Sequence, residues 1–159
     1  MNNKISRMKM IVTMVMILLN VFFGINAVKA QTTSWAWAKS GGGPIDDFVS
    51  RTIVDGSGNV YVAGSFESVS ITIGTITVNN GGTSGRDIFI AKYNSSGVVQ
   101  WVQRITGTMS EYVTGLTSDA TGRIYVVGHF ISPSISFPPY TVANSNTVSP
   151  TNDMFVTCI

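Results

Sequence analysis

Two stretches decide the fold of this chain: DGSGNVYVAGSF at residues 55–66 and DATGRIYVVGHF at residues 119–130, which begin 64 positions apart. The match extends without a gap over residues 37–66 and 101–130, where nine of thirty positions are identical. The identical pairs are Trp37/Trp101, Gly43/Gly107, Val49/Val113, Asp55/Asp119, Gly58/Gly122, Tyr61/Tyr125, Val62/Val126, Gly64/Gly128 and Phe66/Phe130. Further on, DIFIAKY at residue 87 returns as DMFVTCI at residue 153, an offset of 66. A spaced pattern of this length indicates an internal duplication.

Each copy predicts β-strands on both sides of a tight turn. The turn DGSGN supplies an Asp that accepts backbone N–H groups and a Gly that tolerates positive φ. SITIGTITV, from residue 70, alternates Ile and Val with Thr, Gly and Ser, which is typical of a half-exposed hairpin. We therefore expect a four-stranded antiparallel meander of about 64 residues with a variable hairpin inserted in its middle.

The central strands VYVAGSF and DIFIA have no polar face, so each predicted sheet must be stacked between neighbours. This favours an all-β fold of tandem four-stranded blades of an incomplete β-propeller, since propellers have roughly four to eight blades. A β-sandwich is the alternative, although its outer faces should be polar. We expect an N-terminal outer strand and a first repeat at residues 31–104, and a second repeat, truncated at its C-terminus, at residues 105–159.

The first thirty residues have the pattern of a secretory signal peptide. A basic start is followed by an apolar run at about residues 10–25, and small residues precede a cleavage site after Ala30. The run is about sixteen residues long, short for a membrane span of roughly 20, so a retained anchor is the alternative. We expect a secreted or cell-surface protein that keeps no stable membrane span.

Removal of the signal changes the charge of the chain. Four of the ten basic side chains and none of the eight acidic ones lie in residues 1–30, which leaves 6 minus 8, or −2. The sequence pI near 8.8 therefore gives no support for nucleic-acid binding. The single cysteine, Cys158, cannot form an internal disulfide, and we interpret it as a small apolar residue of a strand.

The stretch WVQRITGTMSEYVTGLTSDATGRIYVVGHF, with DIFIAKYNSSGVVQW before it, resembles the SBBP-type β-propeller repeat of bacterial secreted and cell-surface proteins. The resemblance covers nearly all of the chain after residue 30. It implies a repeat protein of several blades and says little about activity. We expect about two repeats in this chain and no C-terminal secretion-sorting domain of the kind that some members carry. YNSSGVVQW is also similar to the closing turn and docking tryptophan of quinoprotein-like propellers, whose repeat is shorter.

Few residues offer chemistry. Asp55, Ser57 and Asn59 resemble the start of a calcium loop, but the second copy places Arg123 at a ligand position, so we interpret the pattern as a turn. The pair Asp46 and Asp47 is replaced in the second copy by a serine and a glutamate. Residues 41–43, three glycines, lack the Lys and helix of a phosphate loop and predict a connection between blades.

His129 is the only histidine and takes the place of Ser65 in the other copy, which predicts a position at a blade edge. No second His or Cys is available to complete a metal site. Trp37 and Trp101 are demanded by the repeat and are predicted to pack, whereas Trp35 has no tryptophan counterpart. We predict no catalytic, cofactor-binding or metal-ligating residue.

The copies differ most in their middle segments, and the second is rich in proline and carries Phe137 and Tyr140. Since loops carry function more often than scaffolds do, the face at residues 137–140 is the expected binding surface. The favoured hypothesis is a non-catalytic binding or structural module with a protein or glycan ligand. The alternatives are an accessory fragment of a larger extracellular enzyme and a truncated gene product without independent function. An unpaired strand at the C-terminus further predicts head-to-tail self-association through blade edges.

Overall fold

The computed structural model describes residues 3–5, 7, 9–11, 13–14, 33–82, 85–149 and 151–159. The chain divides into two units, Met1–Ser34 and Trp35–Ile159. In the first unit the described residues up to Met14 are helical, and they do not form a helix with the length and hydropathy of a membrane span. Most of the predicted apolar run and the cleavage site at Ala30 lie outside the described residues, as does Pro150.

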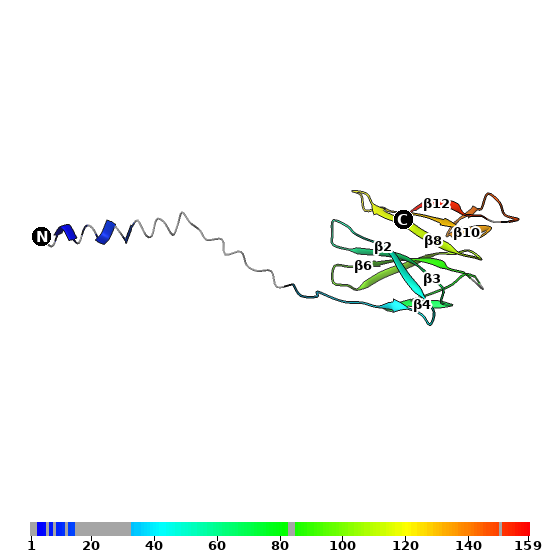
Figure 1. Cartoon of the computed structure of the whole chain (residues 1–159), viewed down its shortest axis with the longest axis horizontal. Coiled ribbons are helices and arrows are strands. Elements are labelled where there is room, and N and C mark those ends of the chain that lie inside the picture. The colour runs from blue at the N-terminus through cyan, green and yellow to red at the C-terminus, as the bar shows by residue number, and fades with distance from the viewer. Residues whose placement is uncertain are drawn as a thin grey trace. The chain divides into compact units, whose positions relative to one another are not determined.

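The second unit is all-β, as the sequence predicts (Figure 1). Its strands in the described residues are β1 (Gly41–Gly42), β2 (Asp47–Val54), β3 (Val60–Phe66), β4 (Ser70–Ile73), β5 (Ile76–Asn79), β6 (Asp87–Tyr93), β7 (Val99–Ile105), β8 (Glu111–Ser118), β9 (Ile124–Phe130), β10 (Ser134–Phe137), β11 (Tyr140–Ala143) and β12 (Asp153–Cys158). All the pairings are antiparallel, and no sheet of the described residues closes on itself. An open arrangement of this kind agrees with an incomplete propeller or a sandwich.

The two copies build two corresponding sheets. The first has the strand order β2-β3-β6-β7, and the second has the order β8-β9-β12. Here β8, β9 and β12 are the counterparts of β2, β3 and β6, and the described residues contain no counterpart of β7 in the second sheet. The variable segments form the hairpins β4–β5 and β10–β11, inserted at the same place in each copy.

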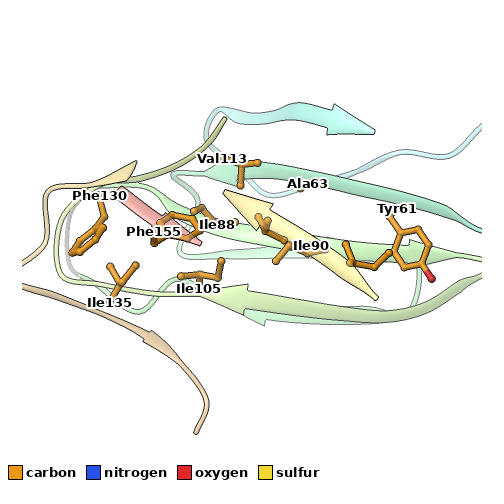
Figure 2. Close-up of a cluster of buried hydrophobic side chains, with 11 residues drawn as sticks. Tyr61, Ala63, Ile88, Ile90, Ile105, Val113, Phe130, Ile135 and Phe155 are labelled. Atoms are coloured by element: carbon orange, nitrogen blue, oxygen red, sulfur yellow. The ribbon is translucent and has the colours of Figure 1, made fainter. Parts of the chain in front are cut away.

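The two sheets pack face to face through one core, drawn in Figure 2. The first sheet contributes Tyr61, Ala63, Ile88, Ile90 and Ile105, and the second repeat contributes Val113, Ile124, Val126, Phe130, Ile135 and Phe155. Arg51 of β2 also donates from Nε to the carbonyl oxygen of Thr114 in β8, at 2.8 Å. One apolar face of each sheet is therefore covered by the other sheet.

The repeated glycine Gly64/Gly128 has a steric cause. A Cβ at Gly64 would lie 1.8 Å from the carbonyl oxygen of Phe48, and one at Gly128 would lie 2.0 Å from that of Tyr112. Both glycines lie opposite a register shift in the neighbouring strand, between Val49 and Arg51 in one copy and between Val113 and Gly115 in the other. The bulge brings backbone close to backbone, so only glycine fits at this position.

Candidate functional site

The hairpin β10–β11 borders a hollow of about 170 Å³, which we call the second-hairpin hollow. It lies between this hairpin, the end of β7 and the end of β12, and its lining includes Gln103, Arg104, Phe137, Pro138, Tyr140 and Ile159. The predicted binding residues Phe137 and Tyr140 therefore meet at one site. Typical small-molecule pockets measure about 300–1,000 Å³, so this hollow accommodates one ring or side chain of a larger ligand.

The two aromatic residues of the hairpin have different environments. Phe137 is anchored, since its ring lies 5.3 Å from that of Phe155 at an interplanar angle of 59°. Tyr140, directly opposite Phe137 in the hairpin register, is 73% exposed. Arg104 donates from its guanidinium to the carbonyl oxygen of Asn79 in the first hairpin. The site thus combines a fixed ring and an exposed ring, while the Arg104 guanidinium is held by the first hairpin.

The first repeat has a related groove of about 250 Å³, which we call the first-repeat groove. It lies beside the hairpin β4–β5, as the second-hairpin hollow lies beside β10–β11. Its lining includes Trp37, Phe48, Val49, Thr52, Val62, Phe89 and Tyr93. This groove is wider because the sheet face beneath it has no second sheet upon it among the described residues.

A pair of buried carboxyl groups lies where the two repeats join. Asp87 and Glu111 are both fully buried, at 0% exposure. Ser132 donates from Oγ to Oε1 of Glu111, and the N–H of Gly107 donates to Oδ1 of Asp87 at 3.3 Å. The remaining oxygen of Glu111, Oε2, has no donor. An unpaired buried carboxylate oxygen is costly, so a proton shared between the two acids is the arrangement that satisfies it.

Electrostatics support a shared proton. Burial, reinforced by the negative charge of Asp87, raises the pKa of Glu111 to about 7. Burial also raises the pKa of Asp87 from its ordinary value. Raised carboxyl pKa values can mark catalytic acids. Here both side chains are inaccessible to a substrate, and the contact of Glu111 with Ser132 has a counterpart in the first copy, which indicates a structural role.

The recurrence is close in its details. In the first repeat Asp47 replaces Glu111 and Ser68 replaces Ser132, each 64 positions earlier. Ser68 donates from Oγ to Oδ2 of Asp47 at 3.2 Å, and the N–H of Gly43 donates to the same oxygen at 2.7 Å. A Cβ at Gly43 would lie 2.5 Å from that of Ser68. In both copies the acid–serine cluster therefore fills the space that a Cβ would need at the repeated Gly43/Gly107 position.

Sequence reasoning missed this cluster because its two acids come from different repeats. It compared Asp46 and Asp47 with Ser110 and Glu111 as neighbours in sequence and did not pair Glu111 with Asp87. A signal was present, since Ser68 and Ser132 continue the identical positions just beyond the aligned thirty.

The turn interpretation of Asp55 and Asp119 is confirmed. Oδ1 of Asp55 accepts the N–H groups of Ser57 and Asn59, each at 2.9 Å. Its Oδ2 accepts the side chains of Asn59 and Tyr61. These hydrogen bonds hold the pKa of Asp55 below its ordinary value, and the bond from the Asn59 side chain contributes most. The same set recurs at Asp119, which also pairs with Arg123 at 2.7 Å.

The position predicted for His129 is wrong. His129 lies in β9, which pairs with β8 on one side and with β12 on the other, so it is on a central strand. Its ring stacks on Tyr112, with centroids 5.1 Å apart. A half-buried central position accepts histidine because the ring lies along a neighbouring aromatic face.

Both repeated tryptophans pack, as predicted. Trp37 stacks on Tyr93 at 6.0 Å and donates from Nε1 to the carbonyl oxygen of Ser95 at 3.2 Å. Trp101 lies 5.9 Å from Tyr61 and packs against the common core. Trp35, the tryptophan without a repeat counterpart, is 94% exposed.

The other two candidates lie in or beside strands. Cys158 lies in β12, as predicted for a strand residue, but its side chain is exposed. In the three-glycine segment, Gly41 and Gly42 form β1, which pairs with β4, so part of this connection is itself a strand. The third, Gly43, belongs to the acid–serine cluster of the first repeat.

Comparison with known proteins gives one relevant similarity. An uncharacterized WD repeat-containing protein of Acanthamoeba polyphaga mimivirus is 28% identical over 109 residues, which cover 60% of this chain and 8% of that protein. The chain thus matches less than a tenth of that relative's length. No family model matches the chain, and no solved structure matches it. The similarity agrees with a repeat protein of the β-propeller type, the architecture of WD repeats.

Proposed function

We propose that this chain is an exported, non-catalytic segment of SBBP-type β-propeller repeats that binds a glycan at the second-hairpin hollow. The observation that carries the proposal is that repeated and varied positions of the two copies have different roles. Residues repeated in both copies form turns, glycine contacts and the acid–serine clusters, whereas the varied hairpin presents Tyr140 at 73% exposure. Ligand-binding residues are expected where a rigid scaffold carries variable loops.

The chemistry of the hollow suits a sugar ring. Tyr140 offers an exposed aromatic face, and Gln103, which also lines the hollow, supplies an amide donor. Sugars present apolar C–H faces and hydroxyl acceptors, which match an aromatic ring accompanied by an amide donor. Phe137 holds the hairpin against the core and so keeps Tyr140 in place.

The tandem-repeat part of the proposal is supported by the two corresponding sheets and by the similarity to a far longer WD repeat-containing protein. A propeller-type arrangement is favoured over a sandwich because the central strands β3, β6 and β9 are largely apolar on both faces. The buried positions of Asp87 and Glu111 favour a non-catalytic role. The basic start and apolar run of residues 1–30 favour export.

A glycan array tests the binding role. We expect the protein to retain a restricted set of glycans and Tyr140→Ala to lower the signal at least tenfold. Val148→Ala is the matched control, because Val148 is 95% exposed in the segment that follows the same hairpin but does not line the hollow. Equal binding by the two variants, or no glycan retained at all, would contradict the proposed ligand and site.

A further inference from the structure

The second sheet exposes an apolar face whose counterpart is buried in the first. Ile88 and Ile90 of β6 are 0% and 1% exposed, because they face the second repeat. Their counterparts in β12, Met154 and Val156, are 84% and 70% exposed. The duplication thus places the same kind of packing surface on both sheets but covers only one of them. We call the surface at Met154 and Val156 the trailing face.

The first sheet exposes the complementary surface. Val113 of β8, which receives the first sheet, is 5% exposed, whereas its counterpart Val49 in β2 is 63% exposed. Val49 lines the first-repeat groove. We call this surface the leading face. Within the chain, the face of the first sheet that corresponds to the trailing face packs on the face of the second sheet that corresponds to the leading face. The trailing face and the leading face themselves are left open.

The segment before the first repeat lies where the last strand of a preceding sheet would lie. Gly42 pairs with Thr72 in β4, and the counterparts Thr106 and Ser136 pair in the same way after β7. The backbone of residues 35–40 forms no ladder with other described strands. The outer side of β12 likewise has no strand beside it among the described residues. The open edge of β12 and the unpaired segment at residues 35–40 could therefore pair with each other as neighbouring strands.

We propose that copies of this chain associate head to tail, with residues 35–41 of one copy pairing antiparallel with β12 of the next as the fourth strand of its second sheet. The leading face of the first copy then packs on the trailing face of the second. The pairing of β6 with β7 gives the register. Because Ile90 pairs with Gln103, Val156 of one copy pairs with Lys39 of the other.

This association accounts for Trp35. Tyr93 pairs with Val99 within the first sheet, so the same register sets Trp35 against Ile159 of the neighbouring copy. A tryptophan 94% exposed in the single chain thereby gains a partner, as interface anchors do. Each copy contributes two sheets, and a ring of roughly four to eight sheets would hold about two to four copies.

The assembly does not depend on a ligand at the second-hairpin hollow, so its failure and that of the proposed function are distinguishable. Light scattering on protein recovered from expression of the full chain should give a mass of two or more chains at tens of micromolar. Met154→Glu, on the trailing face, should give the mass of one chain that still unfolds cooperatively, at a melting temperature lowered by the lost association. Val148→Glu, at a residue that is also largely exposed but lies outside both faces, should keep the assembly. A monomeric unsubstituted protein would overturn the proposal and assign the faces to further repeats of a longer polypeptide.

Cysteine cross-linking tests the register in a Cys158→Ser background. Val156→Cys with Lys39→Cys places two thiols on directly opposed residues, whose Cβ atoms are about 4.5–5.5 Å apart in antiparallel sheets. Copper phenanthroline should then link successive copies into a ladder of covalent species. Val156→Cys with Ala38→Cys shifts one thiol by one residue to the other face of the strand and should not cross-link. Equal cross-linking of both pairs, or of neither, would overturn the register.

Discussion

Replacement of Glu111 by glutamine should stabilise the protein at high pH and leave its stability unchanged at low pH. Glutamine keeps the shape of a protonated glutamate. Its amide oxygen can accept from Ser132, and its amide nitrogen can donate to Asp87, which replaces the shared proton by a permanent donor. The variant therefore lacks the charge that burial penalises while it preserves the hydrogen bonds.

The size of the effect follows from the raised pKa. Burial, with Asp87 adding to it, moves the pKa of Glu111 from 4.5 to about 7 in the folded state. The folded protein holds this proton more tightly, so the stability it contributes is fully present below pH 4.5 and is lost as pH rises through 7. At 1.36 kcal/mol per pH unit, this interval corresponds to about 3 kcal/mol. The free energy of unfolding of Glu111→Gln minus that of the unsubstituted protein should therefore rise from near zero at low pH to about 3 kcal/mol at pH 8.

Urea unfolding followed by tryptophan fluorescence, repeated from about pH 4.5 to 8.5, measures this difference. Asp46→Asn is the control, since it removes an exposed carboxylate close to the counterpart cluster and should give no such rise. A difference between Glu111→Gln and the unsubstituted protein that is constant across the pH range would refute the shared proton. A destabilisation that grows with pH would show that Glu111 is ionised and favourably paired.

Three further predictions concern packing and export. Gly64→Ala should destabilise the protein by at least about 1–3 kcal/mol because its Cβ would overlap backbone, whereas Gly56→Ala, with open space around it and alanine in the other copy, should be neutral in chemical unfolding. Trp101→Ala should cost about 3–5 kcal/mol, and His129→Ala, which loses one aromatic stack, no more than about 1 kcal/mol, so thermal melts that reverse this order would contradict the packing assignment. The intact mass of the secreted protein should equal that of a chain that begins at Gln31. A species that retains residues 10–25 would indicate an anchored protein.

Much of the fold was predictable because its signals are local. The turn at Asp55 depends on hydrogen bonds within a few residues, and the corresponding set at Asp119 follows from the Asp and Gly that both turns share. The inserted hairpins show a period of two, which needs no knowledge of the neighbours. The packing role of Trp101 was inferred by comparing the copies, since a residue required in both belongs to the scaffold.

Other features were not predictable because they depend on contacts between distant segments. The misplacement of His129 came from treating a Ser-to-His exchange as a sign of an edge, whereas stacking on Tyr112 in the next strand accommodates the ring. The pairing of Asp87 with Glu111 arises only when the start of β8 packs beside the start of β6 in the preceding repeat. The steric need for glycine at Gly64 depends on a bulge in the adjacent strand.

The sequence by itself determined the duplication, the strand types, the turns and the place of the variable hairpins, because each depends on side-chain chemistry and spacing along the chain. Only the tertiary structure decided which of two equivalent residues is buried. Val49 and Val113 are the same amino acid at the same position of the repeat, yet they are 63% and 5% exposed. Burial depends on what packs over a residue. The first sheet packs over Val113, whereas the face at Val49 is open.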